Sequence, residues 1–206
     1  MSIEEQILRI DAELKRLMKM YPSIYKTDKV VKGLIPIYYS IFEEFNIRHV
    51  TLLEIGVLHG GFLRWIHDIN KFDKIIGIDI NIDDAVKELS DLSNILLYQG
   101  SQSDVPFLEG IAKEHGGFDV VIDDGSHFIE DVKVSFEALW KHTRIMYIIE
   151  DWDVMFEWGT PGWLEFMQEI MYRQKEQLAI KEVRMGFRHT WGQGHGAYMM
   201  IKRNTG

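Results

Sequence analysis

The feature that most constrains the fold is a regular alternation of short apolar runs with longer amphipathic segments between residues 49 and 151. Apolar runs of this length are typical of strands, and the segments between them have helical periodicity. Strands that alternate with helices form a parallel sheet with right-handed crossovers. We therefore predict an α/β fold with a mostly parallel sheet. The predicted strands are 49–56, 74–80, 94–100, 118–125 and 144–151, and the predicted helices are 60–69, 83–92, 105–115 and 129–140.

The alternation ends after Asp151, where a loop rich in aromatic residues begins. We expect a helix over 164–177 and then two strands, 177–186 and 196–204. The short glycine-rich connection between them predicts an antiparallel pair. The C-terminal part of the sheet should therefore contain an antiparallel strand.

The first 46 residues form a predicted N-terminal helical segment, and residues 47–206 form the predicted main domain. Helices are expected over 2–20 and 37–45, with Pro22 and Pro36 interrupting the chain. An apolar stripe with alternating steps of four and three residues predicts self-association into a homo-oligomer. The stripe consists of Ile3, Ile7, Ile10, Leu14 and Leu17.

Composition excludes several classes of protein. The chain has 206 residues, a formal net charge of −9 and no cysteine. A negative charge disfavours nucleic-acid binding, and the lack of cysteine fits a cytoplasmic location and excludes thiolate metal sites. The N-terminus lacks the apolar region of a signal peptide, and no apolar run approaches ~20 residues, so we expect no membrane span.

A glycine-containing turn follows the first predicted strand, and an acid ends the second. Gly56 permits a tight turn, Gly60 permits close approach of a ligand, and Asp79 is placed to accept hydrogen bonds from ribose. This arrangement suits either a nicotinamide dinucleotide or S-adenosylmethionine. Leu58 interrupts the dinucleotide glycine spacing, and Glu54 would repel a pyrophosphate, so both residues favour S-adenosylmethionine.

Acidic residues also end the fourth and fifth predicted strands. Asp123 and Asp124 follow one apolar run, and Glu150 and Asp151 follow the next. Neighbouring parallel strands bring such ends together, and carboxylates that converge need a cation. Oxygen ligands suit Mg²⁺, or Mn²⁺ in its place. His127, on the following turn, suits a general base, with a fourth metal ligand as the alternative. Helix capping is the competing interpretation of these acids.

The motifs LLEIGVLHGGFLRW, IIGIDI, YQGSQSD, FDVVIDDGSH and YIIED, in this order, resemble the class I S-adenosylmethionine-dependent O-methyltransferases of the macrocin and mycinamicin sugar type, and the cephalosporin-hydroxylase-like proteins. The resemblance covers roughly residues 50–152. It implies a Rossmann-like seven-stranded fold that binds the methyl donor and Mg²⁺ and methylates hydroxyls, commonly on sugars.

The resemblance also assigns residues. It implies His127 as general base and Asp124, Glu150 and Asp151 as metal ligands. The predicted cofactor-binding residues are Glu54, Gly56, Gly60, Asp79, Gly100, Gln102 and Asp123.

Two positions depart from the family pattern. Phe62 replaces a small serine, and Ser101 replaces an aspartate, with Gln102 as the substitute for adenine recognition.

We therefore predict a Mg²⁺-dependent O-methyltransferase acting on a hydroxyl of a sugar or glycosylated small molecule. The alternatives are a non-catalytic cofactor- or metal-binding module and a nicotinamide-dependent oxidoreductase. Four aromatic residues after Asp151 are predicted to border the acceptor pocket, where they could stack on a sugar ring. They are Trp152, Phe156, Trp158 and Trp163.

Overall fold

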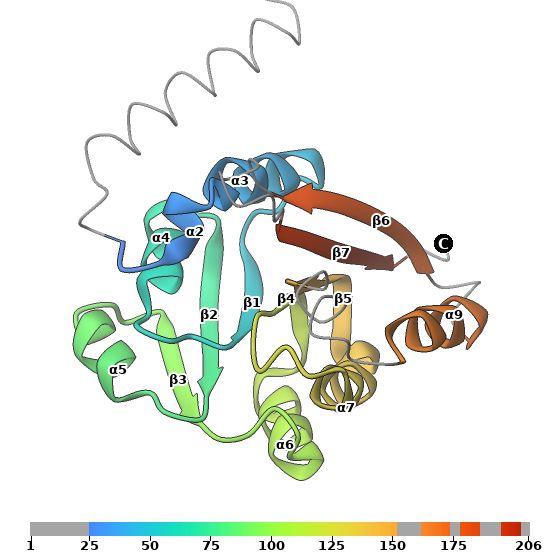
Figure 1. The fold of residues 1–206 in the computed structure, drawn as a ribbon. Coiled ribbons are helices and arrows are strands. Elements are labelled where there is room, and N and C mark those ends of the chain that lie inside the picture. Colours follow the sequence, from blue (N-terminus) through green and yellow to red (C-terminus); the bar gives the residue numbers. More distant parts are fainter. Residues whose placement is uncertain (1–24, 152–161, 174–177, 186–194, 203–206) are drawn as a thin grey trace, which may run out of the picture.

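The computed structural model describes residues 25–151, 162–173, 178–185 and 195–202 (Figure 1). The predicted N-terminal stripe and all of the aromatic loop except Trp163 lie outside these ranges. Self-association and the division of the chain at residue 46 therefore stay predictions. None of the helices in the described ranges has the length and apolar character that crossing a bilayer requires.

Seven strands form one sheet in the order β3-β2-β1-β4-β5-β7-β6 (Figure 1). The first five are parallel to one another, and β7 runs antiparallel to both β5 and β6. The predicted α/β class and the antiparallel C-terminal strand are confirmed. The strands are β1 (Val50–Ile55), β2 (Phe72–Asp79), β3 (Ile95–Gln99), β4 (Phe118–Asp123), β5 (Thr143–Glu150), β6 (Leu178–Met185) and β7 (His195–Lys202).

The helices begin and end at local sequence signals. The side chain of Asp104 caps α6 by accepting from Phe107 N at 3.1 Å, and Gly116 ends that helix in the left-handed conformation. Pro36 does not break the chain as predicted, because it lies in the first turn of α3, where no backbone donor is needed. The helices are α2 (Asp28–Val31), α3 (Leu34–Glu44), α4 (Gly61–Asp68), α5 (Asp83–Leu89), α6 (Val105–His115), α7 (Ile129–Leu139), the 3₁₀ turn η1 (Trp140–His142) and α9 (Trp163–Arg173).

Helices cover both faces of the parallel part of the sheet. One apolar core contains side chains of α3, α4 and α5 against alternate strand residues such as Leu52 and Val120. The other contains side chains of α6, α7 and α9 against the intervening residues, such as Leu53 and Val121. This burial on both faces explains why the strand sequences are almost continuously apolar.

The strand order places the candidate site. Because β1 lies between β2 and β4, the chain leaves β1 toward one edge of the sheet and later returns to its other side. At such a switch point the connections diverge and leave a crevice at the carboxyl ends of the strands, where α/β proteins bind ligands.

Candidate active site

A tight contact joins the ends of β1 and β4. Asp124 N donates to Ile55 O at 2.9 Å. A Cβ atom on Gly56, whose φ is +85°, would lie 2.0 Å from the backbone oxygen of Asp124. Gly56 is therefore required by the approach of these two segments.

A cavity of about 230 Å³ opens at the ends of β1, β2 and β3. Four of the predicted cofactor residues line it, namely Gly56, Asp79, Gly100 and Gln102. Ser101 and Asp131 also contribute to its wall. Sequence reasoning missed Asp131, because an acid in the first turn of a helix is ordinarily explained by the helix dipole.

Asp79 holds the turn beside this cavity. One carboxylate oxygen accepts from Leu58 N at 2.8 Å, and the other accepts from Asn81 N at 3.1 Å. A carboxylate has about four acceptor positions, so Asp79 retains capacity for hydroxyl donors.

Glu54 lies at the end of β1 with only 1% of its surface exposed. Its Oε2 atom has no hydrogen-bond partner among the described residues. Burial raises the pKa of Glu54 well above its usual value, against the lowering effect of the Lys29 charge. A buried oxygen without a donor is costly, and this position suits a cationic or donating ligand group.

Asp123 is buried and is not among the residues that line the cavity. Its carboxylate accepts from Ser135 Oγ at 2.5 Å and from Tyr147 OH at 2.9 Å. Gln102 Nε2 donates to the other oxygen at 3.3 Å, while Gln102 Oε1 accepts from Ser126 N at 2.7 Å. Asp123 and Gln102 therefore fix the turn that follows β4, and the role of Asp123 in cofactor binding stays a prediction.

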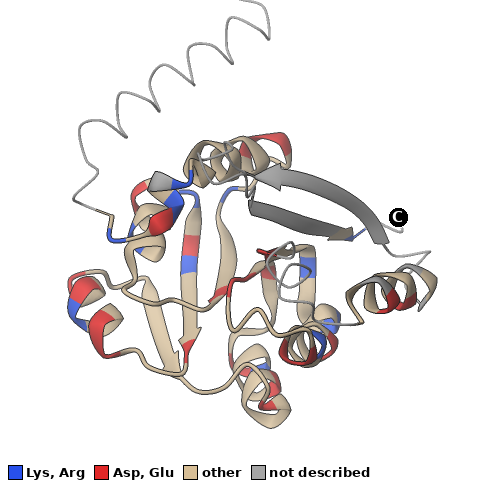
Figure 2. Ribbon diagram, viewed as in Figure 1, with Lys and Arg blue, Asp and Glu red and all other residues tan. Residues whose placement is uncertain are grey.

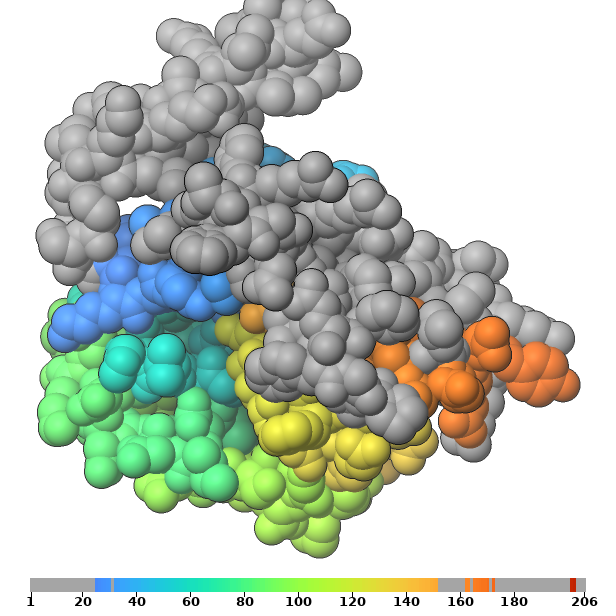
Figure 3. Space-filling view, in the orientation of Figure 1, coloured from blue at the N-terminus to red at the C-terminus, as the bar shows by residue number. Residues whose placement is uncertain are grey.

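Gly60 and Gly61 lie where α4 begins, close to two other parts of the chain. A Cβ atom on Gly60 would lie 2.8 Å from the Leu89 side chain, and one on Gly61 would lie 2.4 Å from the backbone of Lys26. These glycines make room for Leu89 and Lys26, and the role of Gly60 in cofactor binding stays a prediction. Figure 3 shows residues 25–32, in blue, lying against the cyan segment that follows β1.

Among the described residues, Asp124, His127 and Asp151 form a cluster that could hold a metal ion. Each offers one ligand atom, and these atoms lie within 4.8 Å of one another. His127 Nε2 lies 3.8 Å from Asp124 Oδ1 and 3.9 Å from Asp151 Oδ2. His127 and Asp151 have φ values of 59° and 52°, a left-handed conformation that is unusual outside glycine and often found at functional sites.

The predicted ligand Glu150 is not in this cluster, because other groups engage it. Tyr38 OH donates to Glu150 Oε1, and Lys29 Nζ lies 3.0 Å from the same atom. Lys29 also forms an ion pair with Asp124. Lys32, which follows α2, lies 3.4 Å from Asp151 Oδ2. Figure 2 shows basic positions on α2 and acidic segments near the centre of the molecule.

Sequence reasoning missed Lys29, Lys32 and Tyr38. The spacing of the two lysines, three residues apart, places both on one face of a helical turn. Nothing local to the sequence, however, indicates that this face meets the ends of β4 and β5.

Burial and the excess of carboxylates over ammonium groups among the described residues both act on the pKa values of this cluster. Burial acts to lower the pKa of Lys29, but the charges of Asp124, Glu150 and Glu54 raise it well above its usual value. Burial and the charge of Asp124 raise the pKa of Glu150 to about 7, although Lys29 and Tyr38 oppose this. Such an excess of negative charge favours a divalent cation.

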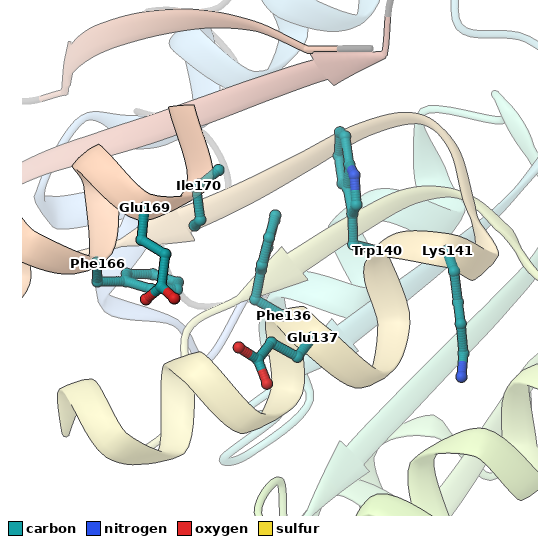
Figure 4. Close-up of a pocket in the computed structure, with 7 residues that line it drawn as sticks. All are labelled: Phe136, Glu137, Trp140, Lys141, Phe166, Glu169 and Ile170. Carbon is teal, nitrogen blue, oxygen red and sulfur yellow. The ribbon is translucent and has the colours of Figure 1, made fainter. Parts of the chain in front are cut away.

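Another hollow, of about 320 Å³, lies between α7 and α9 (Figure 4). Phe136, Trp140, Phe166 and Ile170 line it, together with acidic side chains. It contains none of the predicted site residues. Trp163, predicted to border the acceptor pocket, is only 2% exposed and packs against Phe166 in the core.

No protein-family model matches the chain. It is 40% identical over 125 residues to mycinamicin VI 2''-O-methyltransferase of Micromonospora griseorubida, a match that covers 56% of this chain and 30% of that protein. It is 38% identical over 126 residues to demethylmacrocin O-methyltransferase of Streptomyces fradiae, covering 56% and 31%. The chain thus spans about a third of the length of these relatives.

Solved structures show the same fold. MycE methyltransferase from the mycinamycin biosynthetic pathway, in complex with Mg, SAH and mycinamycin VI, has a TM-score of 0.62 at 29% identity and covers 83% of this chain and 50% of that chain. The N-methyltransferase NodS of Bradyrhizobium japonicum WM9 has a TM-score of 0.62 at 12% identity, covers 86% of this chain and 100% of that chain, and supports the fold alone. The chain is therefore related to the macrocin- and mycinamicin-type sugar O-methyltransferases, and its fold is that of class I methyltransferases.

Proposed function

We propose that this chain is an S-adenosylmethionine-dependent O-methyltransferase that acts on a hydroxyl of a sugar or glycosylated small molecule. One observation carries this proposal. The carboxyl ends of the parallel strands hold both a cavity with nucleotide-binding features and an acid–imidazole cluster. The names of the relatives support the same activity and substrate class.

The residues of the cavity fit the methyl donor. Asp79 would accept hydrogen bonds from the ribose hydroxyls, and Gly56 and Gly100 would let the cofactor lie against the backbone. The buried Oε2 of Glu54 would accept from the amino group of the methionine moiety, which would relieve its lack of a donor. Ser101 and Asp131 lie where they could contact the adenine.

Asp124 and Asp151 would hold Mg²⁺, or Mn²⁺ in its place, with Glu150 beside them. Their carboxylate oxygens suit these ions, and the Mg in the MycE complex supports the choice. When bound, the ion would act as a Lewis acid that lowers the pKa of a hydroxyl.

His127 would be the general base. In the proposed reaction the acceptor oxygen forms a bond to the methyl carbon, the sulfur–carbon bond breaks, and the hydroxyl proton passes to the imidazole. The exposed fraction of the His127 side chain is 22%, which leaves it accessible to an acceptor. The alternative role of His127, as a metal ligand, follows from its short distances to Asp124 and Asp151.

Calorimetric titration with S-adenosylhomocysteine, together with methyl transfer from labelled S-adenosylmethionine to a panel of glycosylated acceptors, tests this proposal. We expect Asp79→Ala to weaken cofactor binding about tenfold or more, because hydrogen bonds to a charged group are lost. Asp73→Ala, at the opposite end of β2, is the matched control and should have little effect. Binding of NADH in preference to S-adenosylmethionine, or cofactor binding that Asp79→Ala leaves intact, would contradict the proposal.

A further inference from the structure

Lys29 is the most deeply buried basic side chain near the acidic cluster. Only 3% of its side chain is exposed, and its ammonium lies between Glu150, at 3.0 Å, and Asp124. A buried ammonium is stable only with such partners. Lys29 therefore supplies an internal positive charge at the point where the sequence predicts a metal ion.

The surrounding residues fix this position. The ammonium lies 5.0 Å from the centre of the Phe62 ring, a cation–π contact, and Tyr38 packs on the same ring at 4.9 Å. Phe62 is one of the two positions that depart from the family pattern. The Thr27 side chain accepts from Lys29 N at 3.3 Å and begins α2. The contact is thus part of the packing of α2, α3 and α4.

Asp124 belongs to two arrangements at once. Its Oδ2 atom pairs with Lys29, while its Oδ1 atom faces His127 within the candidate metal cluster. A divalent ion bound at Asp124 would share this carboxylate with an ammonium, and two cations so close repel each other strongly in a site with little water.

We propose that Lys29 is a positioning residue that holds Asp124 beside Glu150 and competes with a divalent cation for the carboxylate of Asp124. Without metal, Lys29 offsets part of this negative charge and joins Asp124, after β4, to Glu150 at the end of β5. With metal, the ammonium is displaced or repelled, and the cost of this lowers the affinity for the ion. The inference rests on one part of the proposed function, namely that a divalent cation binds at the ends of these strands.

Titration of the full chain with Mn²⁺, followed by electron paramagnetic resonance and by thermal unfolding, tests the proposal. Lys29→Met should bind Mn²⁺ about tenfold or more tightly than the unmodified protein, because a nearby positive charge is removed. Its melting temperature without metal should fall, and Mn²⁺ should raise it by more than in the unmodified protein. Lys29→Arg, which keeps the charge, should stay within about threefold of the original affinity.

Lys26→Met is the matched control, because Lys26 lies in the same segment but pairs with Glu88 on the surface. This substitution also removes one positive charge, but at a position outside the cluster, and it should leave Mn²⁺ affinity nearly unchanged. A purely structural role for Lys29 would predict weaker metal binding in Lys29→Met, and this result or an unchanged affinity would overturn the proposal.

A measurement on the unmodified protein covers the case in which Lys29→Met does not fold. The ¹⁵N resonance of the Lys29 ammonium should shift on saturation with Mg²⁺, whereas that of Lys26 should not. An unchanged Lys29 resonance would overturn the proposal. Asp151→Asn separates this result from the proposed function: if it leaves Mn²⁺ affinity intact, the ion binds elsewhere and the proposed metal site itself is wrong.

Discussion

The two ends of the β4–β5 pair carry acidic residues with different surroundings. At the amino end, Asp119 accepts from Arg144 Nε at 2.6 Å and from Arg144 Nη2 at 2.8 Å, and Thr51 N adds a third bond at 2.8 Å. At the carboxyl end, Asp124 and Glu150 depend on Lys29, which lies 95 residues before Asp124 in the sequence.

The amino end is balanced by its immediate neighbours, because one carboxylate meets one guanidinium on the adjacent strand. The carboxyl end is not balanced, because Glu54, Asp124, Glu150 and Asp151 face fewer cations and some are buried. An additional cation would therefore stabilise the carboxyl end of the pair but not the amino end. The comparison thus separates an ion pair that stabilises the sheet from a cluster suited to binding and chemistry.

The largest expected effect tests the chemistry of the carboxyl end. His127→Ala should slow methyl transfer by about 10²- to 10⁴-fold, because a positioned base is lost. If His127 acts only as a base, Mg²⁺ affinity should change little, and if it is also a ligand, that affinity should fall. Initial rates measured over a range of Mg²⁺ concentrations distinguish these results. His49→Ala, at the amino end of β1, is the control, and full activity in His127→Ala would contradict the assigned role.

A smaller effect is expected from the buried phenol at the same end. Tyr38→Phe removes the hydrogen bond to Glu150 and should lower the free energy of unfolding by about 1.5–3 kcal/mol, the usual range for a bond to a charged group. Urea denaturation measures the change. Tyr39→Phe, at the next position of α3, should change stability by less than about 0.5 kcal/mol. Equal effects of the two substitutions would show that the hydrogen bond from Tyr38 to Glu150 does not stabilise the fold.

The smallest effect is expected at the amino end. Asp119→Asn should lower the free energy of unfolding by about 1 kcal/mol, because the pair is partly exposed. Burial acts to raise the pKa of Asp119, but Arg144 and Thr51 outweigh it and the pKa is lowered. The stabilisation should therefore be complete above about pH 4 and should disappear as the pH falls through the lowered pKa.

Urea denaturation at pH 7 and at pH 3 measures this dependence. Asp119→Asn should also leave Mn²⁺ affinity unchanged, since Asp119 lies at the opposite end of β4 from the acidic cluster. A difference in stability that persists undiminished at pH 3, or a change in Mn²⁺ affinity, would contradict the distinction between the two ends.

The alternation of strands and helices could be predicted from the amino-acid pattern alone, because apolar runs and amphipathic segments reflect burial on one or both faces. The sequence also located Asp79 beside the cavity and the acids at the ends of β4 and β5, since the ends of parallel strands share one edge. These features depend on local pattern and on sheet geometry.

Which groups meet at the carboxyl ends of the strands could not be predicted from the sequence, because it depends on how distant segments pack. The packing of α2 and α3 brings Lys29 and Tyr38 to Glu150, which lies outside the Asp124–His127–Asp151 cluster. Asp123 is buried outside the wall of the cavity. A helix face that meets a distant strand end leaves no periodic signal in the sequence. The contact depends on the direction in which the chain enters the fold, and that direction is set by packing over the whole core.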